Sequence, residues 1–452
     1  MRRKIPRQVQ EIYTTLKNAG FECYVVGGAV RNLVLGTPPK DWDLATDALP
    51  QEVIKLFRKV IPTGVPHGTV TVLHKGISCE VTTFRIDGIY TDLRRPDSVE
   101  YTSSLSEDLR RRDFSINAMA LDIETGEIID PHDGQEDCLR KIIRAIGRPE
   151  ERFDEDGLRI LRGIRFAGRL GFTIESDTLA AMIARADNLK TISAERIRME
   201  IENILESEKP SESFAIMSDT GVLDLILPEL AACRGVIQRE MHSFDVFTHS
   251  ILACDGIVVA DPGLRLAALF HDIGKAPALR FTEDGEPRFF GHEAESARLT
   301  QGILLRLKFP NALIRRVTHL IAQHMFSYDC RWTDAAVRRF IIRVGKENLE
   351  DLFTLRLADS YGRTGVPPDP RSLDGLRRRI TGVLSRDEAL TLKSLKLSGE
   401  DIKNTLSLPP GPSIGQILNF LFESVVEDPS LNDREKLLRI AENFYKTRLK
   451  TG

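Results

Sequence analysis

The chain has 452 residues, which is too long for one ordinary hydrophobic core, so we expect three or four modules. Hydrophobic residues make up 42% and charged residues 29% of the sequence, as in a soluble globular protein, and no apolar run reaches the roughly 18 residues of a membrane span. The net charge of −3 gives no sign of nucleic-acid binding by the chain as a whole, so local basic clusters are the better indicator.

The beginning of the chain and its cysteines point to the cytoplasm. Residues 1–20 are basic and then amphipathic, without an apolar signal core. Six cysteines are scattered without a CxxC pair, which suits a reducing compartment with neither disulfides nor a zinc knuckle. We therefore expect a cytoplasmic protein with no membrane partner, and the sequence leaves its oligomeric state open.

A glycine pair follows the first predicted strand, residues 23–26. Gly27 and Gly28 allow the backbone to approach a ligand, and residues 29–35 then predict a helix. Free N–H groups at the start of that helix, together with the guanidinium of Arg31, would face a triphosphate. The alternative interpretation of such a pair is an ordinary turn.

Two carboxylates come next in the chain, followed by a third. Asp41 and Asp43 are expected on one strand, where side chains two residues apart share a face. Their hard oxygens suit Mg²⁺, and a pair of these ions activates an attacking hydroxyl and neutralises a leaving pyrophosphate. Glu80, on the predicted strand 78–84, is a candidate third ligand, and the alternative is a solvent-facing glutamate. Further short strands are predicted at 69–73 and 128–130.

A polar stretch and a basic cluster complete the first part of the chain. Residues 87–96 are expected to form a mobile functional loop. Arg112 belongs to the basic cluster 110–112, and Asp113 and Asn117 are expected to share a helix face. Together they could hold a ribose hydroxyl, the group that distinguishes NTP from dNTP. Helix capping by Asp113 is the alternative.

From about Pro149 the pattern is almost wholly helical, so the expected fold class is α+β, a head with a small mixed sheet followed by an all-α body. The segment 153–162 opens this body. An aspartate can accept a hydrogen bond from the exocyclic amine of cytosine or adenine, and an arginine can donate to the neighbouring ring nitrogen. Such a pair would admit CTP and ATP and reject UTP and GTP, whereas the alternative is acidic residues that only favour a helix start. The residues concerned are Glu155, Asp156, Arg159 and Arg162.

Arginines recur at helical spacing in the same region. Arg159, Arg162, Arg165 and Arg169 fall within about one third of a helix circumference. They are expected either to contact a phosphate backbone or to form an ordinary solvated face.

Six of the nine histidines fall between His242 and His324, which predicts a second site. Candidate ligands lie on separate predicted helices, so that a bundle could bring them to one cavity. Imidazoles mixed with carboxylates favour first-row transition metals over Mg²⁺. The candidates are His249, His271, Asp272, His292, His324 and Asp359.

The motifs at 27–31, 40–44, 80–85, 111–117 and 155–159 together resemble the class II CCA-adding enzymes (tRNA nucleotidyltransferases), relatives of the bacterial poly(A) polymerases in the polymerase β-like superfamily. The resemblance covers roughly residues 20–210. It implies that Asp41 and Asp43 hold catalytic Mg²⁺ and that Asp113 and Asn117 touch the ribose. It also implies that Glu155, Asp156 and Arg159 act as a protein template for the incoming base.

Two further features bear on this resemblance. Residues 191–196 look like the neck motif of the family. Asn32 departs from it, because the family usually carries an aspartate after the arginine.

The order His249, His271-Asp272, Asp359 resembles the HD-domain metal phosphohydrolases. His292 and His324 look like the extra ligands of a second metal, and Mn, Ni, Fe or Co is the implied ion. In the family, HD modules on such a head are linked to phosphatase or 2′,3′-cyclic phosphodiesterase activity on RNA ends. Cleavage of free nucleotides and a purely structural role remain alternatives.

The expected organisation has five parts: a nucleotidyltransferase head (1–146), a helical neck that recognises the base (147–210), a helical connector (211–240), an HD domain (241–365) and a helical tail (366–452). The stretch 408–415 predicts a helix start, and by resemblance the tail contacts tRNA. The expected function is template-independent addition of CCA to tRNA from CTP and ATP. The alternatives are a poly(A) polymerase, a CC-only or A-only adding enzyme, and an HD hydrolase whose head only holds RNA.

Overall fold

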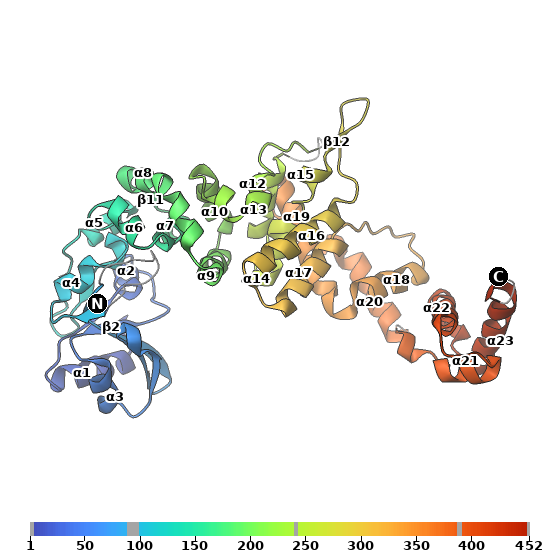
Figure 1. Cartoon of the computed structure of the whole chain (residues 1–452), viewed down its shortest axis with the longest axis horizontal. Coiled ribbons are helices and arrows are strands. Elements are labelled where there is room, and N and C mark those ends of the chain that lie inside the picture. Colours follow the sequence, from blue (N-terminus) through green and yellow to red (C-terminus); the bar gives the residue numbers. More distant parts are fainter. Residues whose placement is uncertain (1–3, 88–98, 239–242, 387–390, 450–452) are drawn as a thin grey trace. The chain divides into compact units, whose positions relative to one another are not determined.

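The computed structural model describes residues 4–87, 99–238, 243–386 and 391–449 and divides the chain into two compact units. The first unit comprises residues 1–235 with 258–262 and 302–310, and the second comprises 236–257, 263–301 and 311–452. In Figure 1 the blue segments carry most of the strands of the first unit, and the later colours are mainly helices. The expected α+β class is confirmed, whereas the five finer boundaries stay predictions. The loop predicted at 87–96 lies, after its first residue, outside the described residues.

A seven-stranded mixed sheet lies in the first unit, in the order β3-β4-β5-β2-β1-β8-β9. Only β2 (Asp43–Thr46) and β5 (Ile77–Thr83) run parallel, and their register places Asp43 opposite Glu80. The other strands are β1 (Cys23–Val26), β3 (Val60–Gly64), β4 (Thr69–His74), β8 (Ala120–Leu121) and β9 (Ile128–Ile129). The strands predicted at 23–26, 69–73, 78–84 and 128–130 are confirmed to within a residue or two. The sequence contains no signal for β3, an edge strand without an alternating buried face, or for the two-residue β8.

Two helices of the first unit begin at the breaks that the sequence predicted near 149 and 210. Proline starts both α6 (Pro149–Glu155) and α10 (Pro210–Asp219), where its missing N–H is not needed. Between them lie α7 (Leu158–Leu170) and α9 (Ala194–Leu205). A Cβ on Gly168 of α7 would lie 2.7 Å from the backbone nitrogen of Ser213 in α10, so this glycine allows the two helices to cross closely.

The second unit takes in α13 (Val246–Asp255), most of α14 (Pro262–Phe270) and α16 (His292–Arg306), α17 (Asn311–Gln323), α18 (Asp334–Val344) and α19 (Leu349–Thr364). His271, Asp272 and His324 directly follow α14 and α17, so the expectation that every candidate ligand lies on a helix is wrong for these three. A Cβ on Gly362 of α19 would lie 2.6 Å from the carbonyl oxygen of His249, so glycine lets α13 and α19 pack closely. Within the described ranges, no helix is both long and apolar enough to cross a bilayer.

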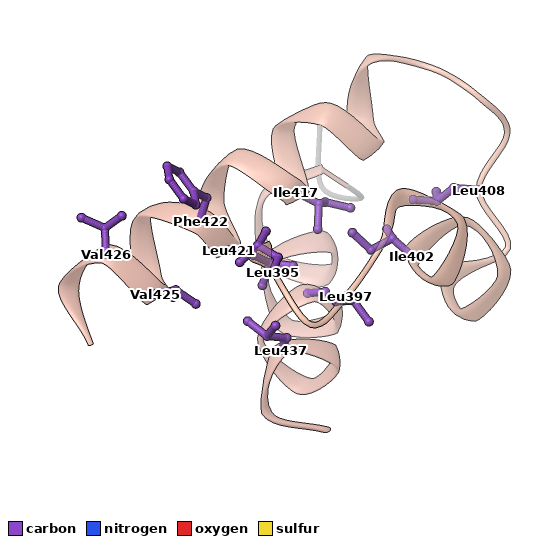
Figure 2. Packing of buried hydrophobic residues seen from close by; sticks show 11 residues of the cluster. Leu395, Leu397, Ile402, Leu408, Ile417, Leu421, Phe422, Val425, Val426 and Leu437 are labelled. Atoms are coloured by element: carbon purple, nitrogen blue, oxygen red, sulfur yellow. The ribbon is translucent and has the colours of Figure 1, made fainter. Parts of the chain in front are cut away.

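The end of the chain has a hydrophobic core of its own. The helices α21 (Gly399–Leu406), α22 (Pro412–Glu427) and α23 (Arg434–Phe444) surround Ile402, Ile417, Leu421 and Leu437, which are fully buried (Figure 2). The helix start predicted at 408–415 is confirmed, because α22 begins at Pro412.

Candidate active sites

A cleft of about 760 Å³ in the first unit gathers most of the residues predicted for the head. It lies beside the end of β1, the start of β2 and the middle of β5, and residues from α7 and α9 also line it. Its lining includes Gly27, Gly28, Arg31, Asp41, Asp43, Glu80, Arg112, Asp113, Asn117, Asp156, Arg159 and Arg162. Among the residues predicted for the head and for base recognition, only Glu155 does not line this cleft.

The glycine turn forms part of the cleft wall and leads directly into α2 (Gly28–Val34). Gly27 has φ +68°, in the left-handed region that glycine adopts without strain. A Cβ there would lie 3.4 Å from Nη1 of Arg112 and 3.7 Å from Oδ2 of Asp43. A side chain at this position would therefore intrude on the space next to the carboxylate.

The predicted metal carboxylates line one cleft around the start of β2, but not as the sequence indicated. The strand begins at Asp43, so Asp41 lies in the bend before it, and the expectation that both occupy one strand is wrong. Asp41 is exposed because the chain turns there before Trp42 enters the core. Asp43 faces Glu80 across the parallel pair, as predicted for Glu80.

The environment of Asp43 fits a divalent cation. Burial and the charge of Glu80 raise the pKa of its carboxyl to about 6, even though Arg112 opposes this effect. A cation would relieve both the lost hydration and the repulsion between the carboxylates. Oxygen-only ligands of this kind suit Mg²⁺.

Arg31 lies in the cleft with two neutral partners. Its Nη1 donates to Oδ1 of Asn117 over 2.7 Å, and its Nε and Nη2 donate to Oδ1 of Asn32 over 3.2 Å. Burial lowers the pKa of Arg31 to about 10. Because both acceptors are amides, these hydrogen bonds leave the positive charge available to an anionic ligand.

Asp113 is already engaged within the protein. Its Oδ2 accepts from Nε of Arg162 over 2.8 Å, and its Oδ1 accepts from Nδ2 of Asn117 over 3.3 Å. Burial alone would raise the pKa of Asp113, but the charge and hydrogen bonds of Arg162 outweigh it and lower the pKa to about 2. The expectation that Asp113 and Asn117 share a helix face is wrong, because Asp113 precedes a short 3₁₀ turn (Ser115–Asn117). The two side chains nevertheless form a hydrogen bond.

The residues predicted to read the base form two ion pairs. Asp156 accepts from Nη1 and Nη2 of Arg196 over 3.1 and 2.6 Å, and Arg159 donates to Oε2 of Glu155 over 2.5 Å. Arg196 was not among the predicted site residues, although it ends the segment 191–196 that resembles the neck motif. A pairing between residues 40 apart has no local signal.

The basic stripe on α7 is only partly solvated, because Arg162 is half-buried and Arg169 alone is exposed. Arg159 and Arg165 are buried, and Nε of Arg165 donates to Oε2 of Glu200 over 2.6 Å. The guanidinium of Arg165 also lies 4.3 Å from the ring centroid of Phe166. All four arginines of the stripe line the cleft, where they add positive potential.

The predicted histidine cluster is assembled in the second unit. Nε2 of His249 lies 3.2 Å from Asp272 and 3.5 Å from Asp359. His271 lies 3.3 Å from Asp272, while His292 and His324 approach its other carboxylate oxygen at 3.3 and 3.7 Å. Among the described residues, two groups bring three ligating atoms within 4.8 Å, and Asp272 belongs to both.

Backbone carbonyls orient three of these rings. Nδ1 of His271, His292 and His324 donates to the carbonyl three residues earlier in the chain, over 2.7, 2.8 and 2.7 Å. Their Nε2 atoms therefore face the cluster, as in metal-binding histidines. Burial lowers the pKa of His271, but the carboxylates of Asp272 and Asp359 outweigh burial and raise it to about 10, so this ring is protonated in the metal-free cluster. Nε2 of His292 and of His324 is buried and forms no hydrogen bond within the described ranges.

The carboxylates of the cluster are held in the charged form that binds a metal. Burial opposes ionisation, but the neighbouring imidazoles and Lys275 lower the pKa of Asp272 well below its usual value. Nζ of Lys275 donates to Asp272 over 2.6 Å. Mixed imidazole and carboxylate ligands fit a first-row transition metal.

Family models match three segments of the chain. The poly A polymerase head domain matches residues 23–144, and the probable RNA- and SrmB-binding site of polymerase A matches residues 171–234. The putative domain 2 of tRNA nucleotidyltransferases matches residues 294–441.

Curated relatives match almost the whole length of the chain. The CCA-adding enzyme of Geobacillus stearothermophilus is 35% identical over 426 residues, 94% of each chain. That of Leuconostoc mesenteroides is 32% identical over 96% of each chain. The enzyme of Oceanobacillus iheyensis is 50% identical over 256 residues, 56% of this chain and 64% of that one.

Solved structures agree with these matches. The crystal structure of the Bacillus stearothermophilus CCA-adding enzyme in complex with CTP is similar with a TM-score of 0.74, 31% identity and 99% coverage of both chains. The Thermotoga maritima CCA-adding enzyme complexed with tRNA has a TM-score of 0.55 at 19% identity and shares the fold.

Proposed function

This chain belongs to the CCA-adding enzymes, a family of nucleotidyltransferases, and we propose that it adds the full CCA sequence to tRNA 3′ ends from CTP and ATP. The observation that carries the proposal is the single cleft in which the glycine turn, the carboxylates of β2 and β5 and the arginines of α7 meet. Relatives described as bound to CTP, ATP and tRNA support these substrates. We further propose that residues 366–452 bind the body of the tRNA.

Asp41, Asp43 and Glu80 are the proposed ligands of Mg²⁺. Mg²⁺ bound there would supply activation of the tRNA 3′-hydroxyl and neutralisation of the leaving pyrophosphate. Arg31 binds the triphosphate, since its own acceptors are neutral. Asn117 orients Arg31 and lies beside Asp113, so the pair can hold the ribose once Arg162 shifts from Asp113.

Base selection is proposed for Asp156 and Arg159. Asp156 accepts from the exocyclic amine that cytosine and adenine share, and Arg159, anchored by Glu155, donates to the neighbouring ring nitrogen. Arg196 orients Asp156 from α9. Replacing Asp156 by Asn removes the preference for that amine, so UTP incorporation should rise relative to CTP. Asp154→Asn, an exposed neighbour, should leave the ratio unchanged.

The test of the main proposal uses three tRNA transcripts that end before CCA, after C and after CC. Each is incubated with labelled CTP, ATP or both, and the products are sized at one-nucleotide resolution. Growth of all three to a fixed CCA end, followed by arrest, is the expected result. Arrest at CC, use of the CC transcript alone or long A tails would instead assign a CC-only enzyme, an A-only enzyme or a poly(A) polymerase.

We also propose a metal-dependent phosphohydrolase activity for the histidine cluster, favoured by the unbonded Nε2 atoms of His292 and His324. His249, His271, Asp272 and Asp359 would hold one ion and His292 and His324 would help to hold a second. Two such ions supply an activated water and stabilise the leaving oxygen of a phosphate ester. A phosphatase or 2′,3′-cyclic phosphodiesterase would expose the hydroxyl that the head extends.

This second activity is tested on RNA that ends in a 2′,3′-cyclic phosphate, with Mn²⁺ and with EDTA. Hydrolysis that needs Mn²⁺ and is lost in His271→Ala supports it, whereas hydrolysis that survives in His271→Ala places the activity elsewhere. An Asp41→Asn, Asp43→Asn double variant should lose incorporation and keep hydrolysis. If that variant still incorporates nucleotides, the assignment of the head is wrong.

A further inference from the structure

The side chain of Phe166, on α7, lies among three arginines of the nucleotide cleft. Its ring centroid is 4.3 Å from the guanidinium of Arg165, 5.4 Å from that of Arg31 and 5.7 Å from that of Arg162. Phe166 lines the cleft but is only 8% exposed. A guanidinium within about 6 Å of an aromatic centroid is attracted by the negative π-face of the ring. One ring therefore stabilises three positive charges that repel one another.

Two of these arginines have carboxylate partners, and the third does not. Nη2 of Arg162 lies 2.7 Å from Asp113, and Nε of Arg165 lies 2.6 Å from Glu200. Arg31 donates to two neutral amides instead and forms no ion pair with any described residue. Burial acts against its charge and lowers its pKa to about 10. The face of the neighbouring ring therefore compensates for part of the hydration that this guanidinium loses.

Packing fixes the ring at this place. Phe114 is fully buried and meets Phe166 edge to face, with centroids 6.0 Å apart and ring planes at 82°. An arginine side chain without such a fixed neighbour samples many rotamers. A ligand binds more weakly in proportion to the fraction of protein that lacks the binding conformation. A fixed ring that holds Arg31 in the cleft thus raises the fraction of the protein that is ready to bind an anion.

We propose that Phe166 is a positioning residue for nucleotide binding, whose ring holds the charged side chain of Arg31 in the cleft before the triphosphate arrives. The inference rests on the proposed function, which assigns Arg31 to the triphosphate. Because Phe166 acts through Arg31, loss of electron density from its ring weakens nucleotide binding and leaves the chemical step unchanged. CTP and ATP are affected equally, since both carry the same triphosphate.

Fluorinated phenylalanines at position 166 test the inference, because fluorine withdraws electron density from the ring face and changes the size of the ring little. Phenylalanine and its 4-fluoro, 3,5-difluoro and 3,4,5-trifluoro analogues are placed there in the full chain, and the Kd of CTP is measured by calorimetry with Mg²⁺ and without tRNA. The Kd should rise with each added fluorine, by on the order of tenfold for the trifluoro analogue. In the incorporation assay, KM for CTP should rise by the same factor while kcat stays constant.

The same analogues at Phe172 are the matched control. Phe172 is also 8% exposed, and no arginine of the described ranges lies over its ring, so the Kd should stay constant. Arg31→Gln should abolish the dependence on fluorine at position 166. A constant Kd across the series at position 166, or a dependence that survives Arg31→Gln, would overturn the inference and leave the proposed function intact. A wild-type chain that binds neither CTP nor ATP would overturn both.

Discussion

Replacing Asp43 by Asn should stabilise the metal-free head while abolishing nucleotide incorporation. Burial and the neighbouring Glu80 raise the pKa of Asp43 from 3.8 to about 6. Between these values the folded state holds a proton that the unfolded chain has released, so the free energy of unfolding falls as the pH rises. The loss of stability caused by ionised Asp43 is therefore absent below about pH 4 and complete above about pH 6.

The magnitude follows from the size of the shift. Each pKa unit corresponds to 1.36 kcal/mol, so a shift of about two units is worth on the order of 3 kcal/mol at neutral pH. Asn is close in size and carries no charge, so it removes this penalty. Mg²⁺ at about 100 times its Kd should raise the free energy of unfolding of the wild type by about 2.7 kcal/mol and that of Asp43→Asn only a little. The difference in stability between the two proteins should therefore become smaller.

The assay is urea unfolding followed by the fluorescence of Trp42, in a Trp332→Phe background so that only the first unit is observed. Asp41→Asn is the matched control, because Asp41 is exposed and its replacement should change the free energy of unfolding by less than about 0.5 kcal/mol. The reasoning is refuted if Asp43→Asn is no more stable than the wild type at about pH 8 in EDTA, or if the difference persists below about pH 4.

Three further outcomes are expected. Glu200→Ala leaves Arg165 buried without its ion-pair partner, so the free energy of unfolding should fall by about 3–5 kcal/mol. Glu151→Ala, which breaks an exposed pair, should lower it by less than about 1 kcal/mol. Urea titrations that give equal losses for the two variants would contradict this. Gly27→Ala should lower kcat/KM for CTP incorporation by about 100-fold, and Gly36→Ala, which has a similar φ but open space around it, should change it little; equal effects would show that strain, not intrusion, matters. His292→Ala should halve the Mn²⁺ bound per chain, as measured by atomic emission, and an unchanged content would remove His292 as a ligand.

Local sequence patterns were sufficient to predict many of the strands, several helix starts and most of the candidate site residues. Short β-branched runs predicted β1, β4 and β5, and prolines marked the starts of α6 and α10. The strand β3 escaped notice because an edge strand with both faces partly exposed has no alternation to detect. Asp41 was placed on a strand because spacing alone cannot show where the chain bends.

Long-range pairings were harder to predict, since they depend on which helices touch. The helical spacing of the arginines on α7 was predicted correctly, but the residues that pack against them could not be inferred from the sequence. Glu200 of α9 forms a buried ion pair with Arg165 of α7, and Arg196 of α9 forms an ion pair with Asp156. Neither acid–base pair has a signal within one helical turn.

By itself, the sequence determined the order of the chemistry along the chain: a glycine turn, carboxylates, an arginine-rich helix and then a spaced set of histidines. These depend on residue type and short spacing, which backbone geometry converts directly into local structure. Only the tertiary structure decided that Asp43 faces Glu80, that Arg31 rests on two neutral amides and that Asp272 serves two groups of histidines. The physical reason is that pairing, burial and pKa depend on atoms brought close from distant positions, and sequence spacing does not measure that distance.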